Sequence, residues 1–264
     1  MEGSAEERLR ALGLEIPAGH ALVSLEERPD LIDPSDHFNG AVWPAFMLES
    51  PVANGLFGRC FQDWPQLQFV LLDASGRIVA TNNAMPLAWD GTDDDLPAGW
   101  EEQVIRSVAD HDAGRTPNTL GAMQIVTDPS IRGSGLSGTM VGAMRAAARS
   151  AGYRAVIACV RPTLKPSYPL IPIEQYAQWR RDDGLPFDPW IRLHARLGGR
   201  VVRASPQSMT MRGTVSDWER WTGLALPQSG SYVIAGATSP VEVDRDRDEA
   251  VYHDQNVWMV HDLG

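Results

Sequence analysis

The residues best suited to bind a charged ligand form a glycine-rich run, Arg132-Gly-Ser-Gly-Leu-Ser137, which is followed by Gly138. Glycine lets the backbone approach a ligand closely, and Arg132 offers a forked cation that matches a phosphate. If a helix begins within this run, its first N–H groups have no partner inside the helix, and the helix dipole is positive there. The chemistry indicated is therefore the binding of a phosphate or pyrophosphate group.

The segments on either side of the run predict a strand and a helix. Gln124-Ile-Val-Thr127 is rich in β-branched residues, and Asp128-Pro129 ends the strand because proline has no N–H to donate. From Ser134 onward, apolar residues recur at helical spacing, at Leu136, Met140, Met144 and Ala147. The glycines would thus lie in a turn that opens a helix.

Two phosphate-binding patterns fit this turn. Gly133-Ser-Gly135-Leu-Ser-Gly138 satisfies G-x-G-x-x-G, the dinucleotide fingerprint of Rossmann domains. In another register, Arg132-Gly-Ser-Gly135-Leu-Ser137 resembles the R/Q-x-x-G-x-G/A loop with which the GNAT acyltransferases hold the pyrophosphate of acyl-CoA. The preceding Asp128-Pro-Ser-Ile-Arg132 is similar to the lead-in of that loop, whereas Ser137 departs from its final glycine or alanine.

The surrounding sequence favours the GNAT interpretation. A Rossmann unit places its first glycine at the end of a strand and an acidic residue about 20 positions later, at the tip of the next strand. Here residues 129–132 intervene, and the next predicted strand, Tyr153–Val160, ends in Arg161. An NADP site that used Arg161 would still need further βα units, which the flanking sequence does not supply. A structural glycine turn without a ligand is the third interpretation.

The resemblance to GNAT proteins implies an α/β (α+β) fold with a mixed, mostly antiparallel central sheet flanked by helices. Two β-rich runs at residues 67–72 and 77–81 predict a hairpin, and residues 100–111 and 173–181 predict helices. A further helix is predicted over residues 188–197, with Asp188 as its N-cap and Pro189 at its first position. The resemblance covers about Ala21 to Arg212, with an insertion between Trp89 and Thr119. We expect a single domain over residues 1–264, in which residues 213–264 form a C-terminal extension packed on that core. The apolar stretch at residues 256–261 should be buried there, by folding back as a strand or clasp.

The resemblance also implies where the cosubstrate binds. Acetyl-CoA, or another acyl-CoA, would place its thioester carbonyl and pantetheine amides along the strand backbone at Ile125, Val126 and Thr127. Its pyrophosphate would contact the glycine turn, formed by Arg132, Gly133, Ser134, Gly135, Leu136 and Ser137.

The acid and base of the reaction are harder to assign. The family often has a tyrosine beyond the parallel strand that protonates the leaving thiolate, and Tyr168 and then Tyr176 are the candidates. His194 could serve as a base near neutral pH, although a lone histidine in an apolar helix also fits a packing role. Glu174 and Asp128 are alternatives to His194. By position in the family fold, Trp43 and Glu49 could face the acceptor.

Composition limits the classes of partner. The net charge of −11 disfavours non-specific attraction to nucleic acid or to anionic membranes. No apolar run approaches the roughly 20 residues that span a bilayer, so we expect a cytoplasmic protein. The two cysteines are too few for a disulfide framework, and no cluster of residues has zinc-ligand spacing, so we expect no metal.

The sequence therefore predicts an N-acyltransferase that moves an acyl group from acyl-CoA to the amine of a small molecule, by direct attack of the amine on the thioester. An aminoacyl transferase that uses aminoacyl-tRNA is one alternative, if Arg180-Arg181 and residues 196–203 form one basic patch. A non-catalytic CoA-binding module and, with less support, an NADP-dependent oxidoreductase are the others. The sequence leaves open whether the protein forms a homodimer.

Overall fold

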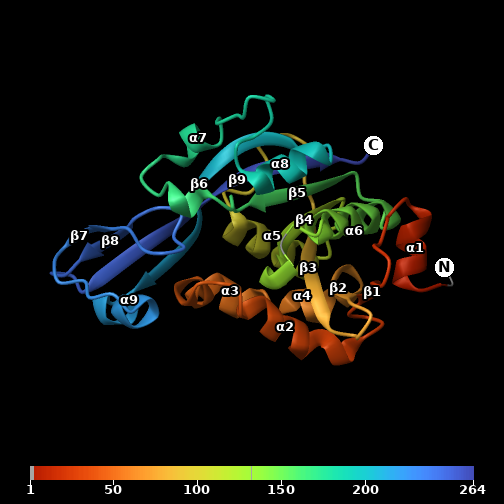
Figure 1. Ribbon diagram of the computed structural model, residues 1–264, viewed down its shortest axis with the longest axis horizontal. Helices are drawn as coiled ribbons and strands as arrows, with labels where there is room; N and C mark the ends of the chain where they lie inside the picture. The colour runs from red at the N-terminus through yellow and green to blue at the C-terminus, as the bar shows by residue number, and fades with distance from the viewer. Residues whose placement is uncertain (1–2, 132) are drawn as a thin grey trace.

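The computed structural model describes residues 3–131 and 133–264, and a single mixed sheet runs through this part of the chain (Figure 1). The strands are β1 (Ala21–Ser24), β2 (Phe69–Leu72), β3 (Ile78–Leu87), β4 (Thr119–Thr127), β5 (Ala155–Val160), β6 (Arg200–Gly213), β7 (Gly230–Tyr232), β8 (Val241–Asp244) and β9 (Glu249–Asp262). Their order in the sheet is β1-β2-β3-β4-β5-β9-β8-β7, and β6 pairs with the other edge of β9.

The helices of the described residues flank this sheet. The α-helices are α1 (Ala5–Ala11), α2 (Ile32–Gly40), α3 (Pro51–Leu56), α4 (Arg59–Asp63), α5 (Trp100–Asp112), α6 (Leu136–Ser150), α7 (Ile173–Tyr176), α8 (Pro189–Arg196) and α9 (Val215–Thr222). The 3₁₀ helices are η1 (Pro29–Leu31), η2 (Ala45–Glu49), η3 (Pro65–Leu67), η4 (Pro129–Ile131) and η5 (Lys165–Ser167). Only β4 and β5 run parallel among the paired strands, so the predicted mixed, mostly antiparallel sheet is confirmed.

Adjacent residues of β3 identify the two faces of the sheet, because successive side chains of a strand point to opposite sides. The Asn82 side chain donates to the Met140 carbonyl of α6, whereas Asn83 accepts a hydrogen bond from Asn39 of α2. Helix α8 shares the α6 face, since Leu193 lies against Gly138 of α6. Helices α2 to α5 lie on the opposite face (Figure 1), which we call the acceptor face because the family resemblance predicts the acceptor there.

Local sequence signals account for the two helices nearest the site. Helix α6 buries its predicted apolar stripe, and eight of its residues are buried in total. Helix α8 begins as predicted, with Asp188 as N-cap accepting from the backbone N–H groups of Trp190 and Ile191 and with Pro189 in its first turn. Gly198 and Gly199 follow its end.

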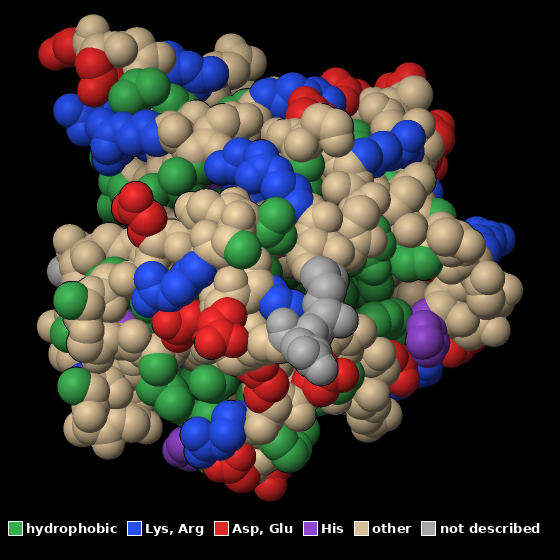
Figure 2. Space-filling model, turned by 90° about the vertical axis from the view of Figure 1, so that its right-hand side faces the viewer, with side chains coloured by type: hydrophobic (Ala, Val, Ile, Leu, Met, Phe, Trp, Pro, Cys, Tyr) green, Lys and Arg blue, Asp and Glu red, His purple; other side chains and the backbone are tan. Residues whose placement is uncertain are grey.

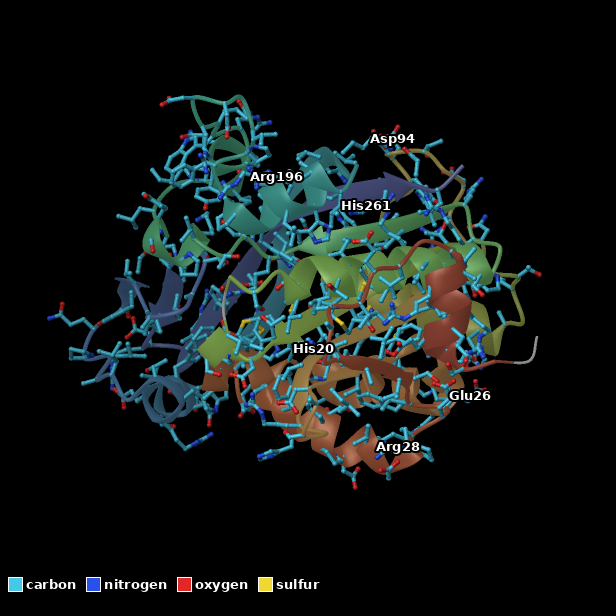
Figure 3. All side chains as sticks on the ribbon, turned by 45° about the vertical axis from the view of Figure 1, so that its right-hand side comes forward. His20, Glu26, Arg28, Asp94, Arg196 and His261 are labelled. Atoms are coloured by element: carbon cyan, nitrogen blue, oxygen red, sulfur yellow. The ribbon has the colours of Figure 1, made fainter. Side chains whose placement is uncertain are left out.

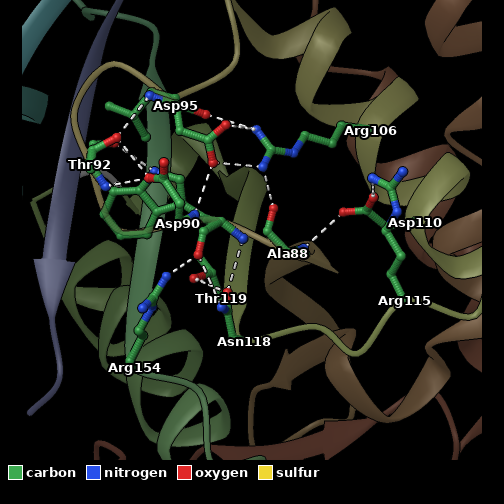
Figure 4. Close-up of polar contacts among 12 residues, drawn as sticks. Ala88, Asp90, Thr92, Asp95, Arg106, Asp110, Arg115, Asn118, Thr119 and Arg154 are labelled. Carbon is green, nitrogen blue, oxygen red and sulfur yellow. Dashed lines mark hydrogen bonds and ion pairs between the residues drawn. The ribbon is translucent and has the colours of Figure 1, made fainter.

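Helix α5 is held in place by a polar cluster at the loop after β3 (Figure 4). Arg106 of α5 donates to both carboxylate oxygens of Asp95 and to the Ala88 carbonyl, and Asp110 accepts from the Ala88 N–H. Asn118 donates to the Trp89 carbonyl from the start of the next strand. These hydrogen bonds tie the second half of α5 to the loop after β3 and so hold the helix against the sheet.

The C-terminal segment contributes an internal strand to the sheet, since β9 pairs with β5 on one side and with β6 on the other. One helix is shorter than the sequence predicts. The helix expected over residues 173–181 ends at Tyr176, because the chain turns back there and the Phe187 N–H donates to the Trp179 carbonyl.

The described surface carries mixed charges. On the face shown in Figure 2, basic and acidic side chains are interspersed. In the arginine-rich segment 196–203, Arg200 pairs with Asp93 and Arg203 donates to the backbone carbonyls of Leu96 and Pro97. Across the described ranges, no helix is both long and apolar enough to cross a membrane.

Candidate active site

The site is built around a gap between the two parallel strands. Strands β4 and β5 pair from Thr119↔Ala155 to Ala122↔Ala158, and the pairing stops there although both strands continue. The cause is a β-bulge: Asn83 of β3 faces Gln124, whereas Ala84 faces Ala122, so Met123 is an extra residue in β4. A bulge bends and twists its strand. Beyond Met123, β4 turns away and its edge toward β5 has no strand partner.

Side chains of α5 fill the base of this gap. The indole N–H of Trp100 donates to the Met123 carbonyl over 2.8 Å, and the Gln103 amide donates to the Ala122 carbonyl over 3.1 Å. The carbonyl groups exposed by the bulge therefore accept hydrogen bonds from the α5 side chains on the acceptor face. This arrangement leaves the segment Gln124–Thr127, including Ile125, Val126 and Thr127, along the open side of the gap.

The glycine turn lies directly after this segment, at the start of α6. Gly135 is the N-cap of α6 with φ +86°, and Gly133 has φ +84°, a backbone region that other residues rarely adopt. Within the described residues, the N–H groups of Leu136 and Ser137 have no hydrogen-bond acceptor. Ser134 and Gly135 are exposed. Arg132, the predicted phosphate ligand, lies outside the described residues.

Trp43 spans the mouth of the gap on the acceptor face. Its indole N–H donates to the Gln124 side chain of β4 over 3.1 Å, and the Arg161 guanidinium, directly after β5, lies 5.7 Å from its ring centre. The Asn83 side chain accepts hydrogen bonds from both Gln124 and Asn39. These bonds fix the Gln124 amide, which in turn accepts from the Trp43 indole. One side chain thus touches the ends of both diverging strands. Trp43 was predicted from its position to face the acceptor.

A buried ion pair fastens the chain that follows β5. Arg161 Nε lies 2.9 Å from Oδ1 of Asp254, a β9 residue that is fully buried. Asp254 also accepts from the Thr238 hydroxyl and from the Tyr252 phenol. The Arg161 guanidinium donates in addition to the Gly236 carbonyl. The segment 236–238 and the β5 exit are therefore joined at one point beside Trp43.

Tyr168, the predicted acid, lies in the loop beyond β5. Its half-buried ring packs edge-on against Trp179 and Phe187, with ring centres 5.0 and 5.9 Å away. Tyr176, the second candidate, is buried and donates to Asp188 over 2.9 Å. Burial raises the pKa of Tyr176 above its usual range, and the Asp188 carboxylate adds to the effect. Tyr176 therefore serves packing, and Tyr168 stays the predicted acid.

His194, the predicted base, lies elsewhere. It is buried on α8, and its Nδ1 is 2.9 Å from Nε2 of His261. Burial lowers the pKa of His194 to about 3, so it does not take up a proton near neutral pH. His261 pairs with Val156 near the start of β5, and the end of the strand at Val160 lies about 13 Å further along. Among the described residues, no hydrogen bond or ring contact joins His194 to Tyr168.

The other acid and base candidates are also placed. Asp128 pairs with Arg77, and its hydrogen bonds from Ser130 lower its pKa. Glu174 and Glu49 are exposed. Sequence reasoning missed a half-buried carboxylate on the acceptor face, Glu101, which follows Trp100 in the first turn of α5. Two glutamates in the first turn of a helix are common for reasons of capping, so the local sequence did not indicate that one of them is half-buried.

Comparisons with known proteins agree with this geometry. No protein-family model matches the chain. The sequence is 32% identical to arginine N-acetyltransferase avaD of Aspergillus versicolor, over 97% of this chain and 98% of that protein. The loading GNATL domain of CurA from Lyngbya majuscula superposes with a TM-score of 0.55 at 16% identity, covering 92% of this chain and 98% of that one, a similarity of fold.

A mixed sheet whose parallel pair opens beside a glycine turn, combined with similarity over nearly the whole chain, defines the class of protein. The chain belongs to the GNAT superfamily of acyl-CoA-dependent N-acyltransferases. It is an enzyme that transfers an acyl group from acyl-CoA to the amine of a small molecule, as the sequence predicted. The Rossmann alternative does not hold, because the sheet is mostly antiparallel.

Proposed function

We propose that this enzyme uses acetyl-CoA to acetylate an amine of arginine, or of a small molecule with the same cationic end group. The acceptor class is suggested by the avaD similarity, since that relative is an arginine N-acetyltransferase. The observation that carries the proposal is Glu101, a half-buried carboxylate on the acceptor face. Among the described residues, no cation pairs with this carboxylate.

Glu101 has only neutral partners. One of its oxygens accepts from the Ser50 hydroxyl over 2.8 Å, and the other accepts from the Thr210 N–H over 3.2 Å. Burial raises the pKa of Glu101, and these two hydrogen bonds offset the increase only in part. Among the described residues no cation lies within ion-pairing distance of it. A guanidinium group would supply the missing charge with two parallel hydrogen bonds.

Glu101 belongs to the helix whose side chains fill the base of the gap. Trp100, the preceding residue, contacts the Met123 bulge at the base of the gap, so Glu101 lies one residue away from a side chain that touches the gap. An acceptor held by Glu101 at one end could present its amine to the thioester at the other. Trp43 narrows the opening between the strands, which favours the small acetyl group.

The proposed reaction needs no covalent intermediate. Cys159, at the end of β5, is buried, and burial raises the pKa of its thiol to about 12, so it stays protonated and unreactive. The amine attacks the thioester carbonyl, the C–N bond forms and the C–S bond breaks. We propose that Tyr168 gives its phenolic proton to the departing CoA thiolate, and that the proton lost by the attacking nitrogen then restores the phenol. The N–H groups of Leu136 and Ser137 hold the pyrophosphate throughout.

The test compares arginine with citrulline, which has the same length and shape but a neutral urea in place of the guanidinium. Release of CoA thiol and the mass of the product are measured for wild type, Glu101→Gln and Glu102→Gln. We expect kcat/KM for arginine to exceed that for citrulline by about tenfold or more, the effect of one charge-assisted pair. Glu101→Gln should abolish this preference, and the exposed neighbour Glu102→Gln should keep it. An unchanged preference in Glu101→Gln contradicts the assignment.

A further inference from the structure

A buried lysine in the loop after β5 takes no part in the steps described above. Lys165, the single lysine of the chain, is fully buried in η5. Its ammonium group donates to the backbone carbonyls of Tyr168 and Thr238, and among the described residues it forms no ion pair. Burial lowers the pKa of Lys165 to about 8, so the group is still charged at neutral pH. A buried charge without a counter-ion is costly, so its presence here calls for a use.

Lys165 and Arg161 are joined to the same short segment. Both side chains donate to backbone carbonyls of residues 236–238. Among the described residues, Asp254 is the one carboxylate within ion-pairing distance of either cation, and it pairs with Arg161. Glu174 is exposed and acts on Lys165 only from beyond that distance. Two cations thus share one carboxylate, and these three side chains, which we call the basic cluster, carry a net positive charge.

Arg161 presents the open side of the basic cluster at the mouth of the gap. Its Nε donates to Asp254 and its Nη2 to the Gly236 carbonyl, whereas Nη1 makes no hydrogen bond with the described residues. The side chain is 18% exposed, and its guanidinium lies against the ring of Trp43. Because the guanidinium is planar and two of its nitrogens are held, the N–H groups of Nη1 point in a fixed direction. They can donate to an anion that enters the mouth.

The chain at residues 43–50 connects this cation with the uncompensated carboxylate of Glu101. At one end of the segment, the Trp43 ring centre lies 5.7 Å from the Arg161 guanidinium. At the other end, the Ser50 hydroxyl donates to Glu101 over 2.8 Å. The segment therefore borders both charged groups, one positive and one negative.

The sheet connects the same two groups a second time. Glu101 accepts from the backbone N–H of Thr210, which is paired with His253 of β9. Asp254, the next residue of β9, holds Arg161. Paired residues of antiparallel strands lie about 5 Å apart, so the carboxylate and the cation contact neighbouring positions of the sheet. The acceptor side of the gap thus carries opposite charges within reach of one small molecule.

We propose that Arg161, reinforced by the charge of Lys165, binds the α-carboxylate of a free amino-acid acceptor and so makes the enzyme select arginine over its decarboxylated amine. A free amino acid with a cationic side chain matches both charged groups, since its carboxylate fits Arg161 and its guanidinium fits Glu101. The α-amine is attached to the carbon that carries the carboxylate, so a carboxylate held at the mouth places that amine at the gap. The inference rests on the proposed function, in which Glu101 holds the guanidinium.

The experiment compares three acceptors with acetyl-CoA as the donor. These are arginine, agmatine, which lacks only the carboxylate, and argininamide, which keeps the size of that group but is neutral there. Release of CoA thiol gives kcat and KM for each acceptor. Wild type should show a kcat/KM for arginine about tenfold or more above that for either analogue, the effect of one charge-assisted hydrogen bond. The difference should lie mostly in KM, because the carboxylate is bound equally before and during the chemical step.

Variants of the basic cluster then locate the carboxylate site. Arg161→Met combined with Asp254→Leu removes the guanidinium without leaving its buried partner unpaired, and should reduce the preference for arginine to about twofold. Lys165→Met keeps the length of the side chain and should reduce the preference in part. Arg28→Gln, which breaks a surface ion pair beside α2 (Figure 3), should leave it unchanged. Acetyl-CoA binding, measured by calorimetry, shows that each variant is folded.

Three results would overturn the proposal. Equal kcat/KM of wild type for arginine and agmatine would show that the carboxylate has no site, and a retained preference for arginine over citrulline would then leave the proposed function intact. A preference for arginine that survives in both cluster variants would place the carboxylate site elsewhere. An equal loss for arginine and agmatine in both variants would show that the basic cluster serves the fold alone. Failure of wild type to acetylate either acceptor would instead contradict the proposed function, and this inference with it.

Discussion

Replacing Asp254 by asparagine should strongly destabilise the protein, because it leaves a buried cation without its counter-ion. The Asp254 side chain is fully buried and that of Arg161 is 18% exposed. The substitution keeps the shape of the side chain and removes only the charge. Breaking one partner of a buried pair typically costs about 3 to 5 kcal/mol. Because Arg161 keeps the Gly236 carbonyl as an acceptor and retains some solvent contact, we expect the lower end, about 3 kcal/mol.

Urea unfolding of wild type and variant measures this loss directly. The matched control is Asp30→Asn, which breaks an ion pair with Arg28 on the surface and should change stability little. The double variant Arg161→Met with Asp254→Leu removes both charges and should recover part of the loss. If Asp254→Asn unfolds within 1 kcal/mol of wild type, roughly the cost of a surface pair, the pair does not fasten the β5 exit and the reasoning is refuted.

Other predictions follow from single groups. Arg132→Ala should weaken CoA binding by about 1.5 to 3 kcal/mol without lowering the melting temperature, and unchanged affinity by calorimetry would remove Arg132 from the site. Tyr168→Phe should lower kcat about 100-fold or more, with CoA affinity retained, if the phenol protonates the thiolate; an unchanged kcat would reject it. The folded-state pKa values of His194 and His261, about 3 and about 4, lie below their usual 6.5. The unfolded state then binds more protons below about pH 6.5, so stability is lost as pH falls, by roughly 1 kcal/mol per histidine between about pH 7.5 and about pH 5.5. In urea unfolding, the stability of His194→Gln should depend less steeply on pH than that of wild type. Equal slopes for the two proteins would show that the buried histidines are not the cause.

Local signals predicted the parts of the fold that depend on neighbouring residues. Proline after Thr127 ends β4, and the glycines with positive φ open α6. Asp188-Pro189 begins α8 at the predicted residue. Each of these features is set within a few residues, by a missing N–H, a left-handed backbone or a capping side chain. The strand, turn and helix proposed to hold acyl-CoA were therefore recognisable before any tertiary contact was known.

Contacts between distant residues could not be predicted in this way. The bulge at Met123, which opens the gap, is a register shift between two strands and has no local signature. The Arg161–Asp254 pair joins residues 93 positions apart, and His194 meets His261 across 67. The position of β9 between β5 and β6 was not predicted for the same reason, since strand order in a sheet depends on long-range pairing. Its apolar run at Val257–Val260 did indicate burial.

The most direct test of the account is CoA binding by a matched pair of glycine variants at the two ends of α6. Gly135 and Gly152 have φ of +86° and +76°, and neither has a neighbour within 4 Å of an added Cβ. Valine should therefore strain both positions alike. Calorimetry should show that Gly135→Val loses CoA affinity at least tenfold, the equivalent of about 1.4 kcal/mol, while Gly152→Val binds as wild type. Equal CoA affinity in the two variants would contradict the assignment of the α6 N-terminus as the pyrophosphate site.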